Sequence, residues 1–314
     1  MNFFDRIGFH DKILFRPSIK YNMIVNLEPQ TSIAVTLNTN THNFVFHKDK
    51  MCSPKSVSTV SLNDLRDILL NNQIEYPSYV YSEARGVYHK YHEELFVNSK
   101  IKHNLIYLPN TMLGVEFVKS HIFTSPFVNV KSPQSVKKIL SASRGKVDKS
   151  AKFATILECD YGSCVVILQN RASSIDTDKG YATSVHEVSE AGIAKIKKGE
   201  RVLIPSGYDY TIVNIKSSPC FVSQFYKQAF RLNYSTIKAA RGMGYYIIRK
   251  NGRIEVTPNS KYKSTVKIKN IKIKEMMKAY QVDFKGSLYS SIINSKHSQD
   301  ISDMLIDFTE YTKA

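Results

Sequence analysis

Short strand-like segments fill the middle of the chain, and this pattern constrains the fold more than any other feature. Between residues 76 and 223, short runs rich in β-branched and aromatic residues alternate with Gly, Pro and Ser. Such runs, bounded by turn residues, predict many short strands that form a sandwich or a barrel. The candidate strands are 103–109, 115–119, 153–169, 183–188, 193–196, 201–204, 210–215 and 220–226. We therefore expect a mainly β protein.

Turn and cap signals predict the elements that precede this region. The run Asn-Thr-Asn-Thr lies between two apolar segments and predicts a β-hairpin that spans Ser32 to His47. Ser61 can cap a short helix whose buried face carries Leu62 and Leu65. Residues 1–60 are accordingly expected to form a β-rich arm.

The region after Tyr245 contains a second hairpin signal and two amphipathic patterns. Asn251-Gly252 predicts a type I′ turn, because that turn needs positive φ at both central residues. Residues 266–269 and 271–274 alternate apolar residues with lysine, which predicts strands with one cationic face. Helical spacing relates Ile301, Met304, Leu305 and Phe308. Residues 266–314 are therefore expected to be an extension that ends in an amphipathic helix, which either docks on the main domain or binds a partner.

The net charge and the cysteines indicate the environment and the partners of the protein. The net charge is +17, from 44 Lys+Arg and 27 Asp+Glu, which fits a nucleic acid or another polyanion as partner. The alternative is a lysine-rich composition in which the lysines are scattered and serve no common function. No Cys-x-x-Cys pair occurs among Cys52, Cys159, Cys164 and Cys220, so buried free thiols are expected.

Targeting signals are absent from the sequence pattern. No run of 18 apolar residues occurs, so no membrane-spanning helix and no membrane partner are expected. Asp5 and Arg6 interrupt the apolar start of the chain, which does not resemble a signal peptide. We expect a cytoplasmic or other reducing intracellular location.

One segment concentrates positive charge. Residues 131–152 contain few apolar residues, which predicts an exposed basic loop. Its cations include Lys137, Lys138, Arg144, Lys146, Lys149 and Lys152. Such a loop can bind phosphates by Coulomb attraction and counterion release. A surface insertion without a ligand is the alternative.

Three segments, taken in order, carry a resemblance to a known family. They are Asn104–Pro109 with Leu113–Ser120, then Lys198–Asn214, then the positions Tyr226, Tyr234, Arg241–Tyr246 and Pro258–Tyr262. In this order and rough spacing they resemble the cupin-type glucose-6-phosphate isomerases of archaea and some bacteria. The resemblance implies a cupin double-stranded β-helix barrel over residues 61–265, with 131–152 as an insertion.

The resemblance also implies where a metal would lie. Such enzymes hold a divalent ion inside the barrel with three imidazoles and one carboxylate, and the metal polarises the sugar carbonyl for aldose–ketose exchange. The matching positions here are Phe123 and Ser125 for two His, Phe153 for the carboxylate and Tyr210 for the third His. Phenyl rings cannot coordinate a divalent ion, and neutral hydroxyls are poor ligands. We therefore expect a degenerate family member with no metal, no other cofactor and no catalytic residue.

Histidines elsewhere offer only weak alternatives to these lost ligands. His121 lies two residues from Phe123, and strand alternation would give a metal only this one imidazole from the motif. His89 and His92 precede Glu93 and Glu94 and could share a helix face, but the spacing is not that of a zinc protease. A solvated charged segment is the expected structure for that run.

Three hydroxyls of the family pattern are retained. Ser120 occupies a phosphate-contacting Thr position, while Tyr226 and Tyr234 match tyrosines near the substrate. A pocket that keeps these groups without a metal would bind a phosphate or a sugar without turning it over. Packing of the tyrosines on barrel strands is the alternative.

These observations support three functional hypotheses. The leading one is a catalytically inactive cupin, a pseudo-isomerase kept for binding a macromolecular partner or a phosphorylated ligand, as a homodimer or within a larger assembly. The second is a divergent but active glucose-6-phosphate isomerase. The third is a basic structural or nucleic-acid-interacting protein, suggested by the net charge and the basic loop.

Overall fold

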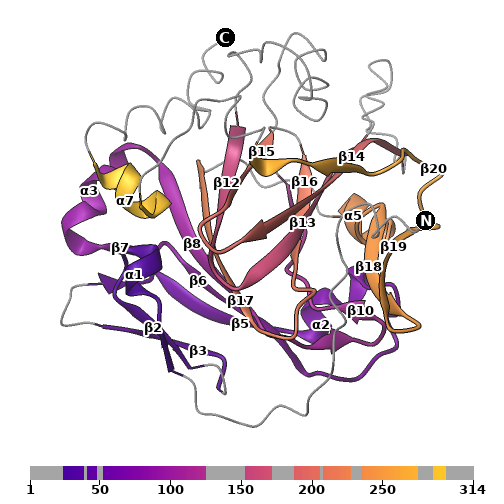
Figure 1. Cartoon of the computed structure of the whole chain (residues 1–314), viewed down its shortest axis with the longest axis horizontal. Coiled ribbons are helices and arrows are strands. Elements are labelled where there is room, and N and C mark those ends of the chain that lie inside the picture. Colours follow the sequence, from indigo (N-terminus) through magenta and orange to yellow (C-terminus); the bar gives the residue numbers. More distant parts are fainter. Residues whose placement is uncertain are drawn as a thin grey trace.

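Two six-stranded sheets form the body of the protein in a computed structural model (Figure 1). The structure describes residues 24–38, 41–47, 52–124, 153–171, 187–205, 208–227, 235–274 and 286–294. The basic loop 131–152, Ser125, Tyr234 and the helix expected near residue 301 lie outside these residues. Within them strands predominate, so the prediction of a mainly β fold is confirmed.

The first sheet has the strand order β15-β12-β17-β8-β6-β5. Its strands are β15 (Arg201–Pro205), β12 (Phe153–Tyr161), β17 (Cys220–Lys227), β8 (Ile101–Leu108), β6 (Tyr79–Arg85) and β5 (Ser56–Ser61). All of its pairs are antiparallel. The sheet therefore already begins at Ser56, five residues before the boundary expected at residue 61.

The second sheet has the order β11-β16-β13-β14-β20, with β21 also paired to β14. Its strands are β11 (Phe123–Thr124), β16 (Asp209–Val213), β13 (Ser163–Arg171), β14 (Glu187–Lys197), β20 (Ser264–Thr265) and β21 (Lys269–Ile271). Between β12 and β17 the chain passes repeatedly from one sheet to the other. This alternation is that of the expected cupin double-stranded β-helix.

Smaller elements cover the two sheets. One further sheet has the order β19-β18-β10-β9, with β19 (Arg253–Pro258), β18 (Tyr245–Lys250), β10 (Glu116–Phe117) and β9 (Met112–Leu113). The N-terminal arm forms β1 (Ile24–Asn26), β2 (Val35–Asn38) and β3 (Asn43–Phe46), while β4 (Cys52–Ser53) pairs with β7 (Tyr88–His89). The helices are α1 (Glu28–Thr31), α2 (Leu62–Leu65), η2 (Arg66–Ile68), η3 (Lys90–His92), α3 (Glu93–Asn98), α5 (Ser235–Ala239) and α7 (Leu288–Ile293).

Local signals placed their elements correctly. The hairpin between Ser32 and His47 is present as β2 and β3. Ser61 caps α2 in a capping box with Asp64, as its position predicted. Asn251 and Gly252 have φ of +51° and +74° and connect β18 to β19.

The strands expected over 266–269 and 271–274 are confirmed only in part. Of these residues, Lys269 to Ile271 form β21, which pairs in parallel with β14 at Gly192 to Ala194. The alternation sets burial at Ile268, Ile271 and Ile273, which are buried while the lysines are exposed, but Val266 is exposed as well. A full strand pair does not form, since only three residues of the run meet a partner strand.

A buried ion pair attaches α7 to the outer face of the first sheet. Glu158 on β12 accepts hydrogen bonds from Arg201 Nε and Nη2 at 2.9 and 2.6 Å. Its second oxygen accepts one from the backbone N–H of Leu288 at 2.6 Å, at the start of α7. Ser287 caps this helix through the N–H of Ser290. The ion pair therefore fixes where the C-terminal segment docks.

His103 lies under this helix and is fully buried. Its Nδ1–H donates to the Val87 carbonyl at 2.8 Å, so Nε2 accepts the Ser223 hydroxyl at 3.2 Å. The ring stacks on Phe225 with centroids 4.1 Å apart and is 5.6 Å from the Tyr289 ring. Burial lowers the pKa of His103 to about 3, because an imidazolium would lose its hydration there.

This depressed pKa predicts a loss of stability in acid. In the unfolded chain His103 takes up a proton near pH 6.5, whereas in the folded protein it does so only near pH 3. The free energy of unfolding is therefore at its full value above pH 6.5 and decreases as the pH falls toward 3. Urea unfolding at pH 7.5 and pH 4 measures how far the free energy of unfolding decreases between these two pH values. This decrease should be smaller by about 3 kcal/mol in His103→Gln than in the wild type. His47→Gln, on the partly exposed arm, is the control and should fall as the wild type does. Equal falls in the wild type and His103→Gln would contradict the assignment.

Candidate functional site

A polar cluster lies between the two sheets, where the resemblance places the substrate. Asn104 Nδ2 donates to Glu83 Oε1 at 3.2 Å and to Gln224 Oε1 at 3.0 Å, all within the first sheet. Gln224 Nε2 then donates to the Tyr210 hydroxyl of the second sheet at 2.6 Å. Glu83 also accepts from Arg85 Nη2 at 2.8 Å. The cluster thus joins two facing sheets through side chains.

Aromatic rings occupy two of the four positions expected to bind a metal in the family. Phe123 and Tyr210 are register partners on β11 and β16, and their rings stack with centroids 5.3 Å apart. Burial raises the pKa of Tyr210, and its hydroxyl is engaged by Gln224. A neutral phenol and a phenyl ring offer a divalent ion no adequate ligand. The residues present do not fit the family's metal.

The other two of these four positions are Phe153 and Ser125. The backbone of Phe153 pairs with Pro205 at the edge of the first sheet. Ser125 lies outside the described residues. Among the described part of the chain, no group of three His, Cys, Asp or Glu side chains is close enough to hold a metal ion.

The three hydroxyls expected at the substrate differ in their surroundings. Ser120 is fully buried, where its Oγ donates to the His121 carbonyl at 2.8 Å and accepts the Ile212 N–H at 3.0 Å. Tyr226 is partly exposed, and its hydroxyl accepts from Asn104 Nδ2 at 3.4 Å. Tyr234 is not among the described residues. Only Tyr226 is therefore seen to join the polar cluster.

His121 also lies at this cluster, held by a tyrosine. Its Nδ1 is 2.6 Å from the Tyr81 hydroxyl, and its backbone N–H donates to the same oxygen at 3.3 Å. Desolvation lowers the pKa of His121, while the carboxylates of Glu83 and Asp64 act in the opposite direction. The imidazole is therefore neutral at physiological pH and occupied by a phenol.

The His-x-x-His run contacts α7 rather than solvent alone. Tyr289 Oη accepts the His89 N–H at 2.9 Å and lies 3.0 Å from His92 Nδ1. His89 Nε2 donates to the Ser32 carbonyl at 3.1 Å. Both imidazoles thus serve the docking of the N- and C-terminal segments on the first sheet, where we had expected a solvated segment.

The prediction from sequence missed Glu83 and Arg85 as members of the cluster. Glu83 is buried, whereas 57% of the Arg85 side chain is exposed. Their ion pair at 2.8 Å holds the guanidinium at the edge of the cluster beside Tyr226. The signal was the alternation in β6, which puts residues 81, 83 and 85 on one face.

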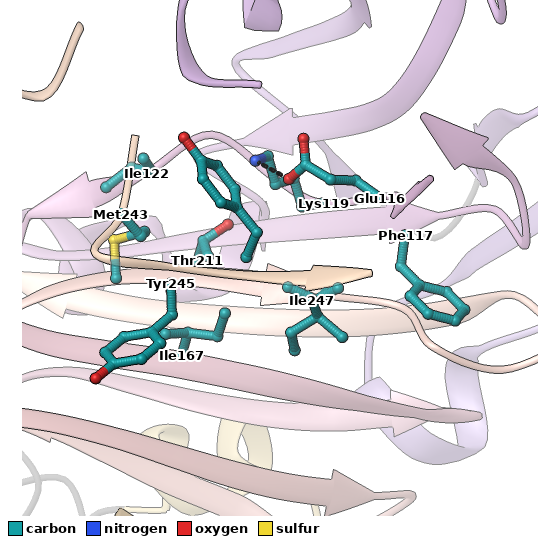
Figure 2. Close-up of a pocket in the computed structure, with 11 residues that line it drawn as sticks. Glu116, Phe117, Lys119, Ile122, Ile167, Thr211, Met243, Tyr245 and Ile247 are labelled. Atoms are coloured by element: carbon teal, nitrogen blue, oxygen red, sulfur yellow. Dashed lines mark hydrogen bonds and ion pairs between the residues drawn. The ribbon is translucent and has the colours of Figure 1, made fainter. Parts of the chain in front are cut away.

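A separate small cavity lies between β10, β18 and the second sheet (Figure 2). Lys119 Nζ is 2.6 Å from Glu116 Oε1, donates to the Ile68 carbonyl at 2.8 Å and lies 5.0 Å from the Tyr246 ring centroid. Glu116 Oε2 accepts the Leu70 N–H at 2.6 Å. Each charge in this cavity is already satisfied by the protein, so the ion pair holds the small sheet in place.

The comparison with family models bears directly on the resemblance. Residues 135–264 match the family described as glucose-6-phosphate isomerase (GPI), which is less than half of the chain. The chain contains a GPI-type segment. This confirms the family resemblance there, and the segment includes Phe153, Tyr210 and Tyr226. Ser120 and Phe123 lie before it.

Solved structures with cupin folds are among those similar to this chain. The Drosophila melanogaster CENP-C cupin domain is 10% identical, with 49% of this chain and 74% of that chain covered and a TM-score of 0.24. Vicilin from Capsicum annuum is 10% identical (48% and 28% covered, TM-score 0.28), and an oxalate decarboxylase is 12% identical (51% and 29% covered, TM-score 0.27). Likenesses of this size carry no argument about function. No curated protein sequence matches the chain.

The link between the sheets should be measurable as stability. Tyr210→Phe removes the acceptor of Gln224 Nε2, and a buried amide left unpaired costs about 1–3 kcal/mol. Urea unfolding should show this loss, and Tyr210→Phe/Gln224→Leu should recover part of it. Tyr226→Phe is the matched control and should cost less than about 1 kcal/mol, because Asn104 keeps two other acceptors. Equal losses in the two single variants would show that the sheets do not depend on this bond.

Proposed function

We propose that this protein is a catalytically inactive cupin of the GPI type, kept for binding a phosphorylated ligand or a macromolecular partner. The stack of Phe123 on Tyr210 carries the proposal. Two positions that would have to supply imidazoles instead supply rings that pack on one another. Metal-dependent polarisation of a sugar carbonyl has no ligand set there.

The cluster retains groups suited to binding. Arg85 presents a largely exposed guanidinium beside the partly exposed Tyr226. Guanidinium groups bind phosphate through paired N–H donors, and a phenol adds one further hydrogen bond. Glu83 keeps Arg85 oriented through the 2.8 Å ion pair. These contacts favour a phosphorylated small molecule as ligand of the cluster.

The first test is elemental analysis of the purified protein together with an isomerase assay on glucose 6-phosphate. We expect no stoichiometric divalent metal and no turnover, either as purified or after chelation and re-addition of Fe²⁺, Mn²⁺ or Zn²⁺. The expectation follows from the aromatic residues at the ligand positions. Stoichiometric metal with turnover that a chelator abolishes would sink the proposal.

The second test asks whether the cluster binds a phosphorylated sugar. Calorimetric titration with glucose 6-phosphate, compared with glucose and with inorganic phosphate, should give binding that Arg85→Gln weakens about tenfold, the effect of losing one charge-assisted contact. Arg253→Gln, at the β18–β19 turn, is the control for general charge and should bind as the wild type does. If both variants bind alike, the cluster is not the phosphate site.

A further inference from the structure

Positive charge is concentrated in one described segment that the proposed function does not use. Residues 241–274 contain ten Lys or Arg and one acidic residue, Glu255, so they supply +9 of the net charge of +17. The segment comprises β18, β19, β20, β21 and their connections. Nine of its ten cations are exposed, and Arg249 is partly buried over the Phe117 ring at 5.3 Å.

The end of this segment forms a row of lysines along the edge of the second sheet. Residues 264–271 follow β14 in parallel, with Glu187 paired to Ser264 and Ala194 to Ile271, and a helical turn begins at residue 273. Buried isoleucines at 268, 271 and 273 anchor the row from below. The lysines at 267, 269, 272 and 274 are exposed between them. In Figure 1 β14 and β20 lie on the side of the molecule away from α3 and α7.

Neighbouring charges on β14 strengthen the row. Lys195 and Lys272 directly follow the paired residues Ala194 and Ile271. Lys197 and Lys198 at the end of β14 are exposed. These cations add to the positive charge of the edge, which favours an anion laid across it.

Two acidic side chains near the end of β14 are engaged by residues other than Lys267, Lys269 and Lys274. Glu190 accepts the Tyr208 hydroxyl, and Glu200, just after β14, accepts the N–H of Lys197 at 3.1 Å and lies 3.9 Å from Lys197 Nζ. Among the described residues, no ion pair involves Lys267, Lys269 or Lys274.

We propose that this edge, defined by Lys267, Lys269, Lys272, Lys274 and the lysines that end β14, binds the phosphate backbone of a nucleic acid without reading its sequence. Lys267 and Lys269 are both exposed and lie two residues apart beside β14, about 6–7 Å from each other along an extended chain, which suits a repeating line of phosphates. No exposed aromatic side chain lies in the described part of segment 241–274, so base stacking contributes nothing there.

A membrane fits the edge less well. Binding at a lipid surface needs apolar side chains that enter the headgroup region beside the cations. Val266, 38% exposed, is the exposed large apolar residue of the described row, and the chain contains no Trp. The chemistry is therefore that of a phosphodiester chain, and it is independent of the ligand cluster at Arg85.

The test measures how binding depends on salt. Fluorescence anisotropy with a labelled oligodeoxythymidylate of about 20 nucleotides should give an affinity that falls linearly, on log scales, between about 50 and 200 mM salt. K267Q/K269Q should lower the slope magnitude by about 1.4 and the affinity at low salt by tenfold or more, because two phosphate contacts are lost. K55Q/K90Q removes the same charge from exposed lysines on other elements and should behave as the wild type does.

Each alternative has its own result. If K267Q/K269Q binds with wild-type affinity and slope, or if K55Q/K90Q loses as much, the edge is not the binding surface. If the lysines only protect the sheet edge from pairing with other chains, K267Q/K269Q self-associates in sedimentation and keeps full affinity. Vesicles with about 30% phosphatidylserine that bind as tightly as the oligonucleotide, with the same loss in K267Q/K269Q, would overturn the choice of a nucleic acid. Thermal melts of both variants confirm that each is folded.

Discussion

The hydrogen bond between Gln224 and Tyr210 is the constraint on which the interior depends. Gln224 is buried in the first sheet, so both ends of its amide need partners. Its oxygen takes Asn104 from the neighbouring strand, and its nitrogen reaches across to Tyr210 in the second sheet. Tyr210 is thereby held where its ring stacks on Phe123. One buried amide therefore helps to hold the aromatic stack at the positions where the resemblance implies a metal.

Local chemistry explains which elements the sequence could predict. The Ser61 capping box and the Asn251-Gly252 turn depend on residues within three positions of one another, so the pattern alone suffices. The cluster at Glu83 depends on the pairing of β6 with β8 and on the second sheet lying opposite, which no local pattern contains. The family resemblance predicted that Tyr210 and Tyr226 lie inside the barrel. Glu83 has no counterpart in the motifs on which the resemblance is based, so its place in the cluster was not predicted.

The docking of α7 shows the same limit for the outer face. Its six residues are too few for a clear helical period, and its position depends on Glu158, 130 positions earlier in the chain. Tyr289 then contacts His89, His92 and His103, so three imidazoles that looked like ligand candidates or strand residues serve one packing site. A His-rich pattern cannot be assigned to metal or packing until the residue opposite it is known.

Buried carboxylates also decide what the surface can do. Glu83, Glu116 and Glu158 are each buried and paired with one Arg or Lys, because an unpaired buried charge would be strongly destabilising. Each pair is neutral, so the whole net charge of +17 must lie outside them. Lys267, Lys269 and Lys274 belong to none of these three pairs and lie exposed among the buried isoleucines at 268, 271 and 273. Aromatic rings fill the interior at Phe123 and Tyr210, whereas exposed cations line the edge along residues 264–274, so the accessible positive charge of this region lies on the outside of the fold.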